Sequence, residues 1–293
     1  MTESKLAFTP VVIIGSGRSG TNALRDMLTR LPEFETWKCD EINPIWRHGN
    51  LSWPNDEIPA ERATPRVRNF IRGAFVKLWS ASHCPRFVVE KTCANSLRVP
   101  FIDTVLPEAR YIHIVRNGFD VVASARKRWK GDLELPGFSY FSAKIRYTPL
   151  RDLPIYGWSF LKSRFALAFG GDRRLGVWGP RFAGMETMGP LTLEVLCAHQ
   201  WAACVEQADA GFSQIDAKRV LLLRYEDFTH DPHKTLVDIL AFLGTTANEI
   251  DINEAVGPVR ATSVGKGQSL RDALPPEVHN IMADALGNHG YGI

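Results

Sequence analysis

The segment from residue 11 to residue 28 constrains the fold of this chain most. The apolar run Val11-Val12-Ile13-Ile14 predicts a buried strand, because all four side chains are β-branched. The loop Gly15-Ser16-Gly17-Arg18-Ser19-Gly20 follows, and residues 21–28 have helical spacing. Glycines allow a tight turn, and the free N–H groups of a first helical turn attract anions. We therefore predict that this loop holds a phosphate-like group.

The same loop departs from the nucleotide triphosphatase pattern G-x-x-x-x-G-K-[ST]. Gly15 and Gly20 have the required spacing, but Thr21 stands where that pattern has lysine. The cation of the loop is Arg18, inside it. A kinase needs the lysine on the β- and γ-phosphates, so a 5′-phosphate or phosphosulfate fits better. A P-loop nucleotide kinase and a non-catalytic nucleotide-binding protein are the alternatives.

Further apolar runs predict three more strands, at residues 86–90, 109–115 and 219–223, separated by helical patterns. Nearly all-apolar strands that alternate with helices predict an α/β fold, a P-loop-type three-layer sandwich with a central parallel sheet flanked by helices. Predicted helices cover residues 60–82, 119–129, 191–212, 232–243 and 275–286. The carboxyl ends of parallel strands meet at one crevice, so we expect Lys91, Arg116 and Tyr225 beside the glycine loop.

A second motif begins where the third predicted strand ends. Arg116 is followed by the turn Asn117-Gly118 and by a helix that carries Ser124 about two turns further on. An arginine and a hydroxyl in this arrangement can bind one phosphate, the arginine as a bidentate partner. The other interpretation is an ion pair between Arg116 and Asp120, and we also expect Asp120 to cap the helix.

These motifs resemble the sulfotransferases that use 3′-phosphoadenosine 5′-phosphosulfate (PAPS). Gly17-Arg18-Ser19-Gly20-Thr21 is similar to their 5′-phosphosulfate loop, and Arg116 with Ser124 is similar to their 3′-phosphate motif. Arginine within the loop is closer to the tyrosylprotein and carbohydrate branch than to the cytosolic small-molecule branch. The resemblance covers residues 11–45, 86–129 and 190–291. It implies transfer from PAPS to a hydroxyl, adenosine 3′,5′-bisphosphate (PAP) as product, and no metal.

The resemblance also implies which residues bind the donor. Tyr225 would lie near the adenine, and the loop over residues 260–274 would close over the 3′-phosphate. This chain has Gly267-Gln268 where the family often has an aromatic residue. The implied donor-binding residues are Gly17, Arg18, Ser19, Gly20, Thr21, Asn22, Arg116, Ser124, Tyr225, Lys266 and Gly267.

Sulfuryl transfer needs a general base for the acceptor hydroxyl and a fixed cation for the leaving phosphate. The catalytic cations implied here are Arg18 and, near the bridging oxygen, Lys91. The small-molecule branch has a histidine after this lysine, but the segment here is Lys91-Thr92-Cys93-Ala94-Asn95. Glu41 matches the place of the glutamate base in the tyrosylprotein and heparan branch, and Glu90 is the other candidate. His113 is expected to be a packed core residue.

The acceptor side is predicted from an insertion at about residues 130–190 of a single domain that spans residues 1–293. Residues 126–190 hold 12 Lys and Arg against 5 Asp and Glu, although the whole chain carries only +3. Aromatic side chains between these charges suit a sugar ring or a phenol, and the charge suits an anionic acceptor. A glycan or glycolipid hydroxyl is the first prediction and a tyrosine or phenol the second. Trp178-Gly179-Pro180-Arg181 is a candidate acceptor wall.

Composition limits the remaining possibilities. A net charge of +3 in 293 residues does not by itself indicate a nucleic-acid partner. The five cysteines form no C-x-x-C pair, which favours reduced thiols in a cytoplasmic protein and no zinc site. We expect neither a signal peptide nor a transmembrane segment, because the chain has no apolar run of about 18 residues.

Overall fold

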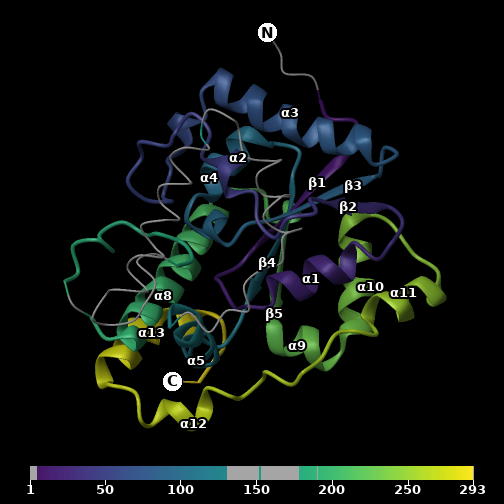
Figure 1. Cartoon of the computed structure of the whole chain (residues 1–293). Helices are drawn as coiled ribbons and strands as arrows, with labels where there is room; N and C mark the ends of the chain where they lie inside the picture. The colour runs from purple at the N-terminus through teal and green to yellow at the C-terminus, as the bar shows by residue number, and fades with distance from the viewer. Residues whose placement is uncertain (1–4, 131–151, 153–177, 190, 293) are drawn as a thin grey trace.

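The computed structural model describes residues 5–130, 152, 178–189 and 191–292. In this part of the chain a five-stranded sheet forms the centre, with strand order β2-β3-β1-β4-β5 and all neighbours parallel (Figure 1). Its strands are β1 (Thr9–Ile14), β2 (Phe34–Thr36), β3 (Phe87–Lys91), β4 (Arg110–Val115) and β5 (Val220–Arg224). Because β1 lies between β3 and β4 in parallel register, the loops that follow these strands leave the sheet at the same edge.

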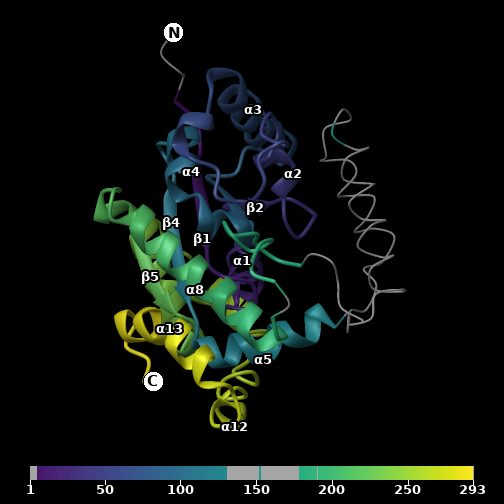
Figure 2. The same cartoon turned by 90° about the vertical axis from the view of Figure 1, so that its left-hand side faces the viewer.

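Alternate residues of β1 pack into separate cores on the two faces of the sheet. Val12 and Ile14 pack with α3 (Pro65–Ala81) and α4 (Val99–Val105). Val11 and Ile13 pack with α1 (Thr21–Leu28), α10 (Pro232–Leu243) and α11 (Glu249–Val256). Helices therefore cover both faces of the sheet, as the two perpendicular views show (Figures 1 and 2). The predicted three-layer α/β fold is confirmed.

A third core lies beyond the end of β4. It joins α5 (Gly118–Trp129), α8 (Leu193–Phe212) and α13 (Pro276–Asn288). The indole nitrogen of Trp201, on α8, donates a hydrogen bond of 3.1 Å to the backbone oxygen of Arg116. This core therefore fixes the start of α5 and the residue that precedes it, which is where the sequence predicts a binding motif.

The four predicted strands are all present, as are the helical segment predicted over residues 21–28 and the five other predicted helices, with boundaries shifted by a few residues. The largest shift is at α3, which begins at Pro65 rather than at residue 60, because the Thr64 side chain caps it by accepting the Val67 N–H. A short 3₁₀ turn, Ala60–Arg62, precedes it. The elements that the sequence did not predict are β2, α2 (Asn43–Trp46), α4, α9 (Tyr225–His230), α11, α12 (Gln268–Arg271) and the 3₁₀ turns Cys93–Leu97 and Ala217–Arg219.

Two predictions concern the whole chain, which the structure describes only in part. The single domain and its insertion are not tested, since most of residues 130–190 lie outside the described residues. Among the helices that are described, none is both long and apolar enough to cross a membrane.

The aromatic cluster under α3 gives a test of this fold. Phe75 is fully buried and meets Trp37 edge-on, with ring centroids 4.7 Å apart. Replacing Phe75 by Ala should lower the free energy of unfolding by about 3–5 kcal/mol, because it leaves a cavity and removes an aromatic pair. Its neighbour Val76 is exposed, and Val76→Ala should change stability by no more than about 0.5 kcal/mol. Urea denaturation of both variants measures the difference, and equal losses would contradict this packing.

Candidate active site

The loop between β1 and α1 is shaped by close approaches that only glycine permits. A Cβ on Gly20, which has φ 88°, would lie 2.3 Å from a ring carbon of Tyr225, and one on Gly15 would lie 2.6 Å from the backbone oxygen of Ile114. The buried hydroxyls of Ser16 and Ser19 are 2.5 Å apart and bond to each other. The predicted tight turn is therefore present. Of the residues after it, Thr21 is buried and Asn22 is exposed.

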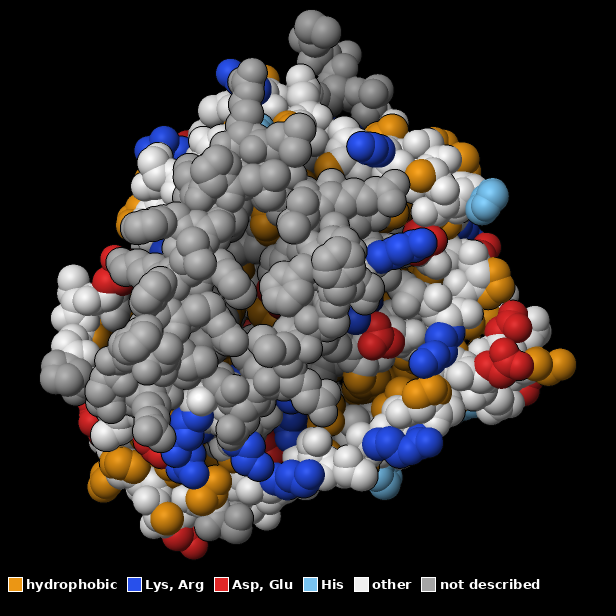
Figure 3. Space-filling model, viewed as in Figure 1, with side chains coloured by type: hydrophobic (Ala, Val, Ile, Leu, Met, Phe, Trp, Pro, Cys, Tyr) orange, Lys and Arg blue, Asp and Glu red, His pale blue; other side chains and the backbone are white. Residues whose placement is uncertain are grey.

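Arg18 is the cation of this loop, held with a left-handed φ of 73°. Its side chain is partly exposed, and its Nε donates a hydrogen bond of 3.0 Å to the Ser124 hydroxyl on α5. Partial burial lowers the pKa of Arg18, and the nearby charges of Arg128 and Arg116 lower it further. Arg18 forms no ion pair with any carboxylate among the described residues. Lys and Arg side chains gather on this region of the face in Figure 3, near α5 and α12. An anionic ligand would relieve this repulsion.

Arg116 is buried and joins several segments of the site. Its guanidinium donates to the backbone oxygen of Arg18 at 3.0 Å, to Asp120 at 3.2 Å and to the backbone oxygen of Ser263. It also lies 4.4 Å from the ring centroid of Tyr225. The expected ion pair with Asp120 is thus present. The predicted phosphate contact stays a prediction, and the buried Nε of Arg116 has no hydrogen-bond partner among the described residues.

Asp120 does not cap α5, so that expectation is wrong. Asn117 is the residue directly before the helix, and its side chain accepts the Phe119 N–H at 3.0 Å. Asp120 lies in the first turn and accepts two backbone N–H groups from a distant segment, Gly265 at 2.9 Å and Gly267 at 2.5 Å. The predicted C-terminal loop is therefore fixed against the start of α5. Lys266 is exposed between the two glycines.

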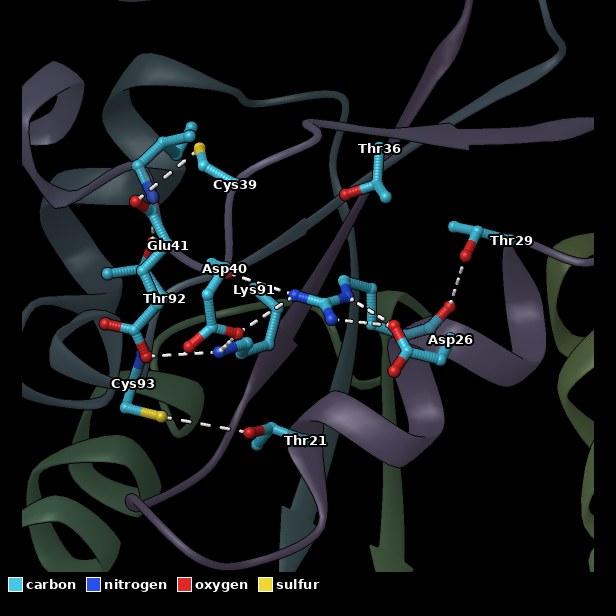
Figure 4. Close-up of polar contacts among 12 residues, drawn as sticks. Thr21, Asp26, Thr29, Thr36, Cys39, Asp40, Glu41, Lys91, Thr92 and Cys93 are labelled. Atoms are coloured by element: carbon cyan, nitrogen blue, oxygen red, sulfur yellow. Dashed lines mark hydrogen bonds and ion pairs between the residues drawn. The ribbon is translucent and has the colours of Figure 1, made fainter. Parts of the chain in front are cut away.

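A second cluster lies at the end of β3 (Figure 4). The Lys91 side chain is almost fully buried, and its Nζ donates to Asp40 at 3.0 Å and to Glu41 at 3.1 Å. Burial alone would lower the pKa of Lys91, but Glu41 and Asp40 outweigh burial and raise that pKa. Glu41 also accepts the Cys93 N–H at 3.2 Å, and its side chain is 29% exposed. The cluster therefore holds a buried, permanently charged ammonium under a carboxylate that reaches the surface.

Glu90 has no access to solvent. It accepts hydrogen bonds from the Thr92 hydroxyl at 2.5 Å and from the Asn95 amide at 2.8 Å. Burial raises the pKa of Glu90 to about 7. A base must reach the acceptor hydroxyl, so this geometry favours Glu41 over Glu90. His113 lies in the core beside Asp209, and burial lowers its pKa to about 4.

The predicted acceptor wall lies against the phosphate loop. A Cβ on Gly17 would be 3.4 Å from the Trp178 ring. The Gln200 amide holds the segment by donating to the backbone oxygens of Trp178 and Pro180 at 2.9 and 2.8 Å. The buried Asp56 carboxylate accepts the Arg181 N–H at 2.9 Å. The other aromatic residues of the predicted insertion, up to residue 177, lie outside the described residues.

Comparison with known proteins identifies the family. The model of the sulfotransferase family matches residues 10–152 and 180–249, which is more than half of the chain. The chain belongs to the sulfotransferase family. This is an enzyme family, so the prediction of a sulfotransferase is confirmed at that level. The finer assignment to the tyrosylprotein and carbohydrate branch is not tested by this match.

Solved sulfotransferase structures share the fold. The sulfotransferase domain from the curacin biosynthetic pathway is 15% identical with a TM-score of 0.56, and the alignment covers 99% of this chain and 100% of that domain. The sulfotransferase from Alicyclobacillus acidocaldarius is 16% identical with a TM-score of 0.54, and 98% of each chain is covered. The domain from the Synechococcus PCC 7002 olefin synthase is 17% identical with a TM-score of 0.53, covering 99% and 98%. A search of curated proteins finds no match.

Within this sulfotransferase the predicted residues fall into two neighbouring groups. The first group is joined by direct contacts among Arg18, Ser124, Arg116 and Tyr225. Gly267 is joined to it through Asp120, which binds both the Gly267 N–H and Arg116. Lys91 and Glu41 form the second group. The two groups meet where the Thr21 hydroxyl lies 3.8 Å from the Cys93 sulfur.

Sequence reasoning missed three polar residues that shape the site. Asp56 and Gln200 lie far from the motifs in sequence and carry no local signal. Asp40 adjoins Glu41, and that position was its only signal.

The buried Glu90 gives a test by pH. In the unfolded chain its pKa is near the ordinary value of 4.5, whereas the folded value is about 7. Between these values the folded state keeps a proton that the unfolded state loses, so the free energy of unfolding falls as pH rises, by up to roughly 3 kcal/mol. The Glu90→Gln variant should lack this slope. Urea denaturation of both proteins from pH 4.5 to 8 measures it, and parallel curves would show that Glu90 is not buried as described.

Proposed function

We propose that this sulfotransferase moves the sulfuryl group of PAPS to a hydroxyl of a glycan or glycolipid and releases PAP. The supporting observation is the convergence at one sheet edge of Arg18, a cation with no described ion pair, and the Lys91–Glu41 pair. Arg18 suits a bound anion, and the Lys91–Glu41 pair combines a cation for the leaving group with a base. A tyrosine or another phenol is the second acceptor class, as in the tyrosylprotein and carbohydrate branch.

The donor is proposed to lie along the contacts that join the first group of residues. The 5′-phosphosulfate would bind the backbone N–H groups of residues 17–22 and the Arg18 side chain. The 3′-phosphate would bind Ser124 and the Arg116 and Lys266 side chains beside Gly267, and the adenine would contact Tyr225. The support is that the Arg18 Nε donates to the Ser124 hydroxyl at 3.0 Å, so one residue proposed for each phosphate is in contact with the other.

The transfer step is an in-line displacement at sulfur. Glu41 takes the proton of the acceptor hydroxyl as the acceptor oxygen forms its bond to sulfur. The bond between sulfur and the 5′-phosphate oxygen breaks, and its electron pair stays with PAP. Arg18 and Lys91 stabilise the negative charge that develops on that oxygen. No residue in this step requires a metal. The absence of a metal from the reaction stays a prediction from the family resemblance.

The acceptor class rests on the chemistry of the wall beside the loop. Trp178 offers an aromatic face at Gly17, and residues 126–190 carry an excess of positive charge. Aromatic faces bind the apolar side of sugar rings as well as phenols, and the charge favours acceptors that already carry acidic groups. An acidic glycan therefore fits both features.

Calorimetry with PAP, 5′-AMP and ATP with Mg²⁺ tests the donor site. The Arg116→Ala variant should lose tens- to thousands-fold in PAP affinity, about 2–5 kcal/mol, because it removes a charge-assisted phosphate contact. The loss for 5′-AMP, which lacks the 3′-phosphate, should be smaller. Arg126, on the helix α5 that follows Arg116, pairs with Glu194 at 2.7 Å, and Arg126→Ala should bind PAP like the wild type. Tighter binding of ATP with Mg²⁺ that ignores Arg116 would instead favour a nucleotide kinase.

Radiolabelled PAPS and an acceptor panel test the base. The panel contains sulfated and unsulfated glycosaminoglycan oligosaccharides, galactosylceramide and 4-nitrophenol. Glu41→Gln should lower turnover by about 10²–10⁴-fold, the usual loss for a general base, with little change in PAP affinity. Within the described part of the chain, the Glu35 carboxylate accepts one hydrogen bond, from the neighbouring Thr36 N–H, and Glu35→Gln should keep wild-type turnover. Near wild-type turnover in Glu41→Gln would remove this assignment.

A further inference from the structure

Lys91 is held by two carboxylates, not one. A lysine ammonium has three N–H donors, and here Asp40 takes one at 3.0 Å and Glu41 takes another at 3.1 Å (Figure 4). The third N–H has no hydrogen-bond partner among the described residues. A single base would need only the Glu41 contact, so the second carboxylate calls for an explanation.

Asp40 is itself fixed from the opposite side. The guanidinium of Arg25, on α1, donates to the Asp40 carboxylate and to its backbone oxygen, each at 3.1 Å. Burial would raise the pKa of Asp40, but the charges of Lys91 and Arg25 outweigh it and lower that pKa. Asp40 is therefore a permanent anion between two cations. Its carboxylate accepts a hydrogen bond from Lys91.

We propose that Asp40 is a positioning residue that keeps Lys91 in place and keeps Glu41 basic during transfer. This proposal rests on the proposed function. A glutamate paired alone with a lysine is a weak base, because the whole charge of the lysine stabilises its ionised form. Sharing Lys91 with a second carboxylate reduces that stabilisation and adds like-charge repulsion. Glu41 can then accept the proton of the acceptor more readily.

The second carboxylate also balances charge through the reaction. As Glu41 takes the proton it becomes neutral and its hold on Lys91 weakens. Asp40 does not titrate in this step, so the ammonium keeps one anionic partner while the leaving phosphate gains charge. Lys91 therefore stays where the leaving oxygen needs it, and its alignment does not depend on the protonation of the base.

The groups around Glu41 come from several elements in the described part of the chain. Lys91 and the buried Glu90 belong to β3, and Cys93 belongs to the 3₁₀ turn that follows. Burial and the negative charge of Glu41 raise the pKa of the Cys93 thiol, so the thiol stays neutral. Glu90 is a like charge only above about pH 7. Lys91 is the cation that Glu41 binds among the described residues, and Asp40 shares it, so the titration of Glu41 is the property on which a change at Asp40 should act.

The test follows the titration of Glu41 itself. Carbon-13 NMR of protein labelled at the glutamate carboxyls gives the Glu41 midpoint, assigned by the signal that Glu41→Gln lacks. Asp40→Asn should lower this midpoint by about half to one pH unit, because it removes a neighbouring negative charge. Asp26 binds the same Arg25 at 2.7 Å but does not touch Lys91, so Asp26→Asn is the matched control and should leave the midpoint unchanged. An unchanged or raised midpoint in Asp40→Asn would overturn the proposal.

Kinetics separate positioning from damage to the fold. In Asp40→Asn the acidic limb of turnover should move to lower pH together with the NMR midpoint, and the plateau should fall severalfold. A merely structural defect would lower the plateau without moving the limb, and that result would also overturn the proposal. Asp40→Ser gives the same test if the Asn variant melts early. Failure of the wild type to bind PAP would refute the proposed function alone, since the Glu41 titration needs no donor.

Discussion

The structure depends on a buried parallel strand, β1, with buried strands on both sides. Residues 11–14 are completely buried, so no charge can be placed along this strand. The buried charged residues Glu90 and Lys91 lie at the carboxyl end of β3, and the buried Arg116 directly follows β4. A buried charge is costly without a partner, and the two buried cations found there each have one. Lys91 is paired with Asp40 and Glu41, and Arg116 is paired with Asp120.

Among the described residues, this pairing distinguishes Lys91 and Arg116, whose charges are already paired, from Arg18, which forms no ion pair. Arg116 holds the Arg18 backbone, Asp120 and the segment at Ser263, and it supports the Tyr225 ring. It acts as scaffold even before any ligand is present. The Arg18 side chain contacts only a neutral hydroxyl among the described residues. A phosphate group that arrives at this edge therefore meets a prearranged cation, whose desolvation is already partly complete.

The C-terminal residues extend the same scaffold. The Tyr291 hydroxyl donates to the Glu226 carboxylate at 2.6 Å, and its oxygen lies 3.1 Å from the backbone oxygen of Val115. Glu226 also accepts the Asn117 N–H at 3.1 Å. The residues on both sides of Arg116 are thus tied to the end of the chain. Asp120 ties them to residues 265–267 as well. The position of the donor site therefore depends on contacts that span more than a hundred residues of sequence.

Local signals explain which parts of this arrangement the sequence predicts. The apolar runs of β1, β3 and β4 are long enough to show, and glycine spacing marks the phosphate loop. The strand β2 has three residues and shows no periodicity. The position of Asp120 next to a helix start predicts a cap. No local feature of the sequence reveals that the backbone N–H groups of Gly265 and Gly267 bind its carboxylate instead. The resemblance named Glu41 and Lys91, but the contact between Lys91 and Asp40 depends on tertiary packing across about fifty residues.

Three carboxylates near Lys91 show how burial assigns different chemistry to the same functional group. Glu90 is adjacent to Lys91 in sequence but fully buried, and burial raises its pKa to about 7, so below that pH its carboxyl group is mostly uncharged. Asp40 is pinned between Lys91 and Arg25 and keeps its charge. Glu41 has one cation, one backbone N–H and an exposed edge. Asp40 and Glu41 both reach the surface, so they differ in their partners: two cations hold Asp40, whereas one cation and one backbone N–H hold Glu41, which is why we propose Glu41 as the base.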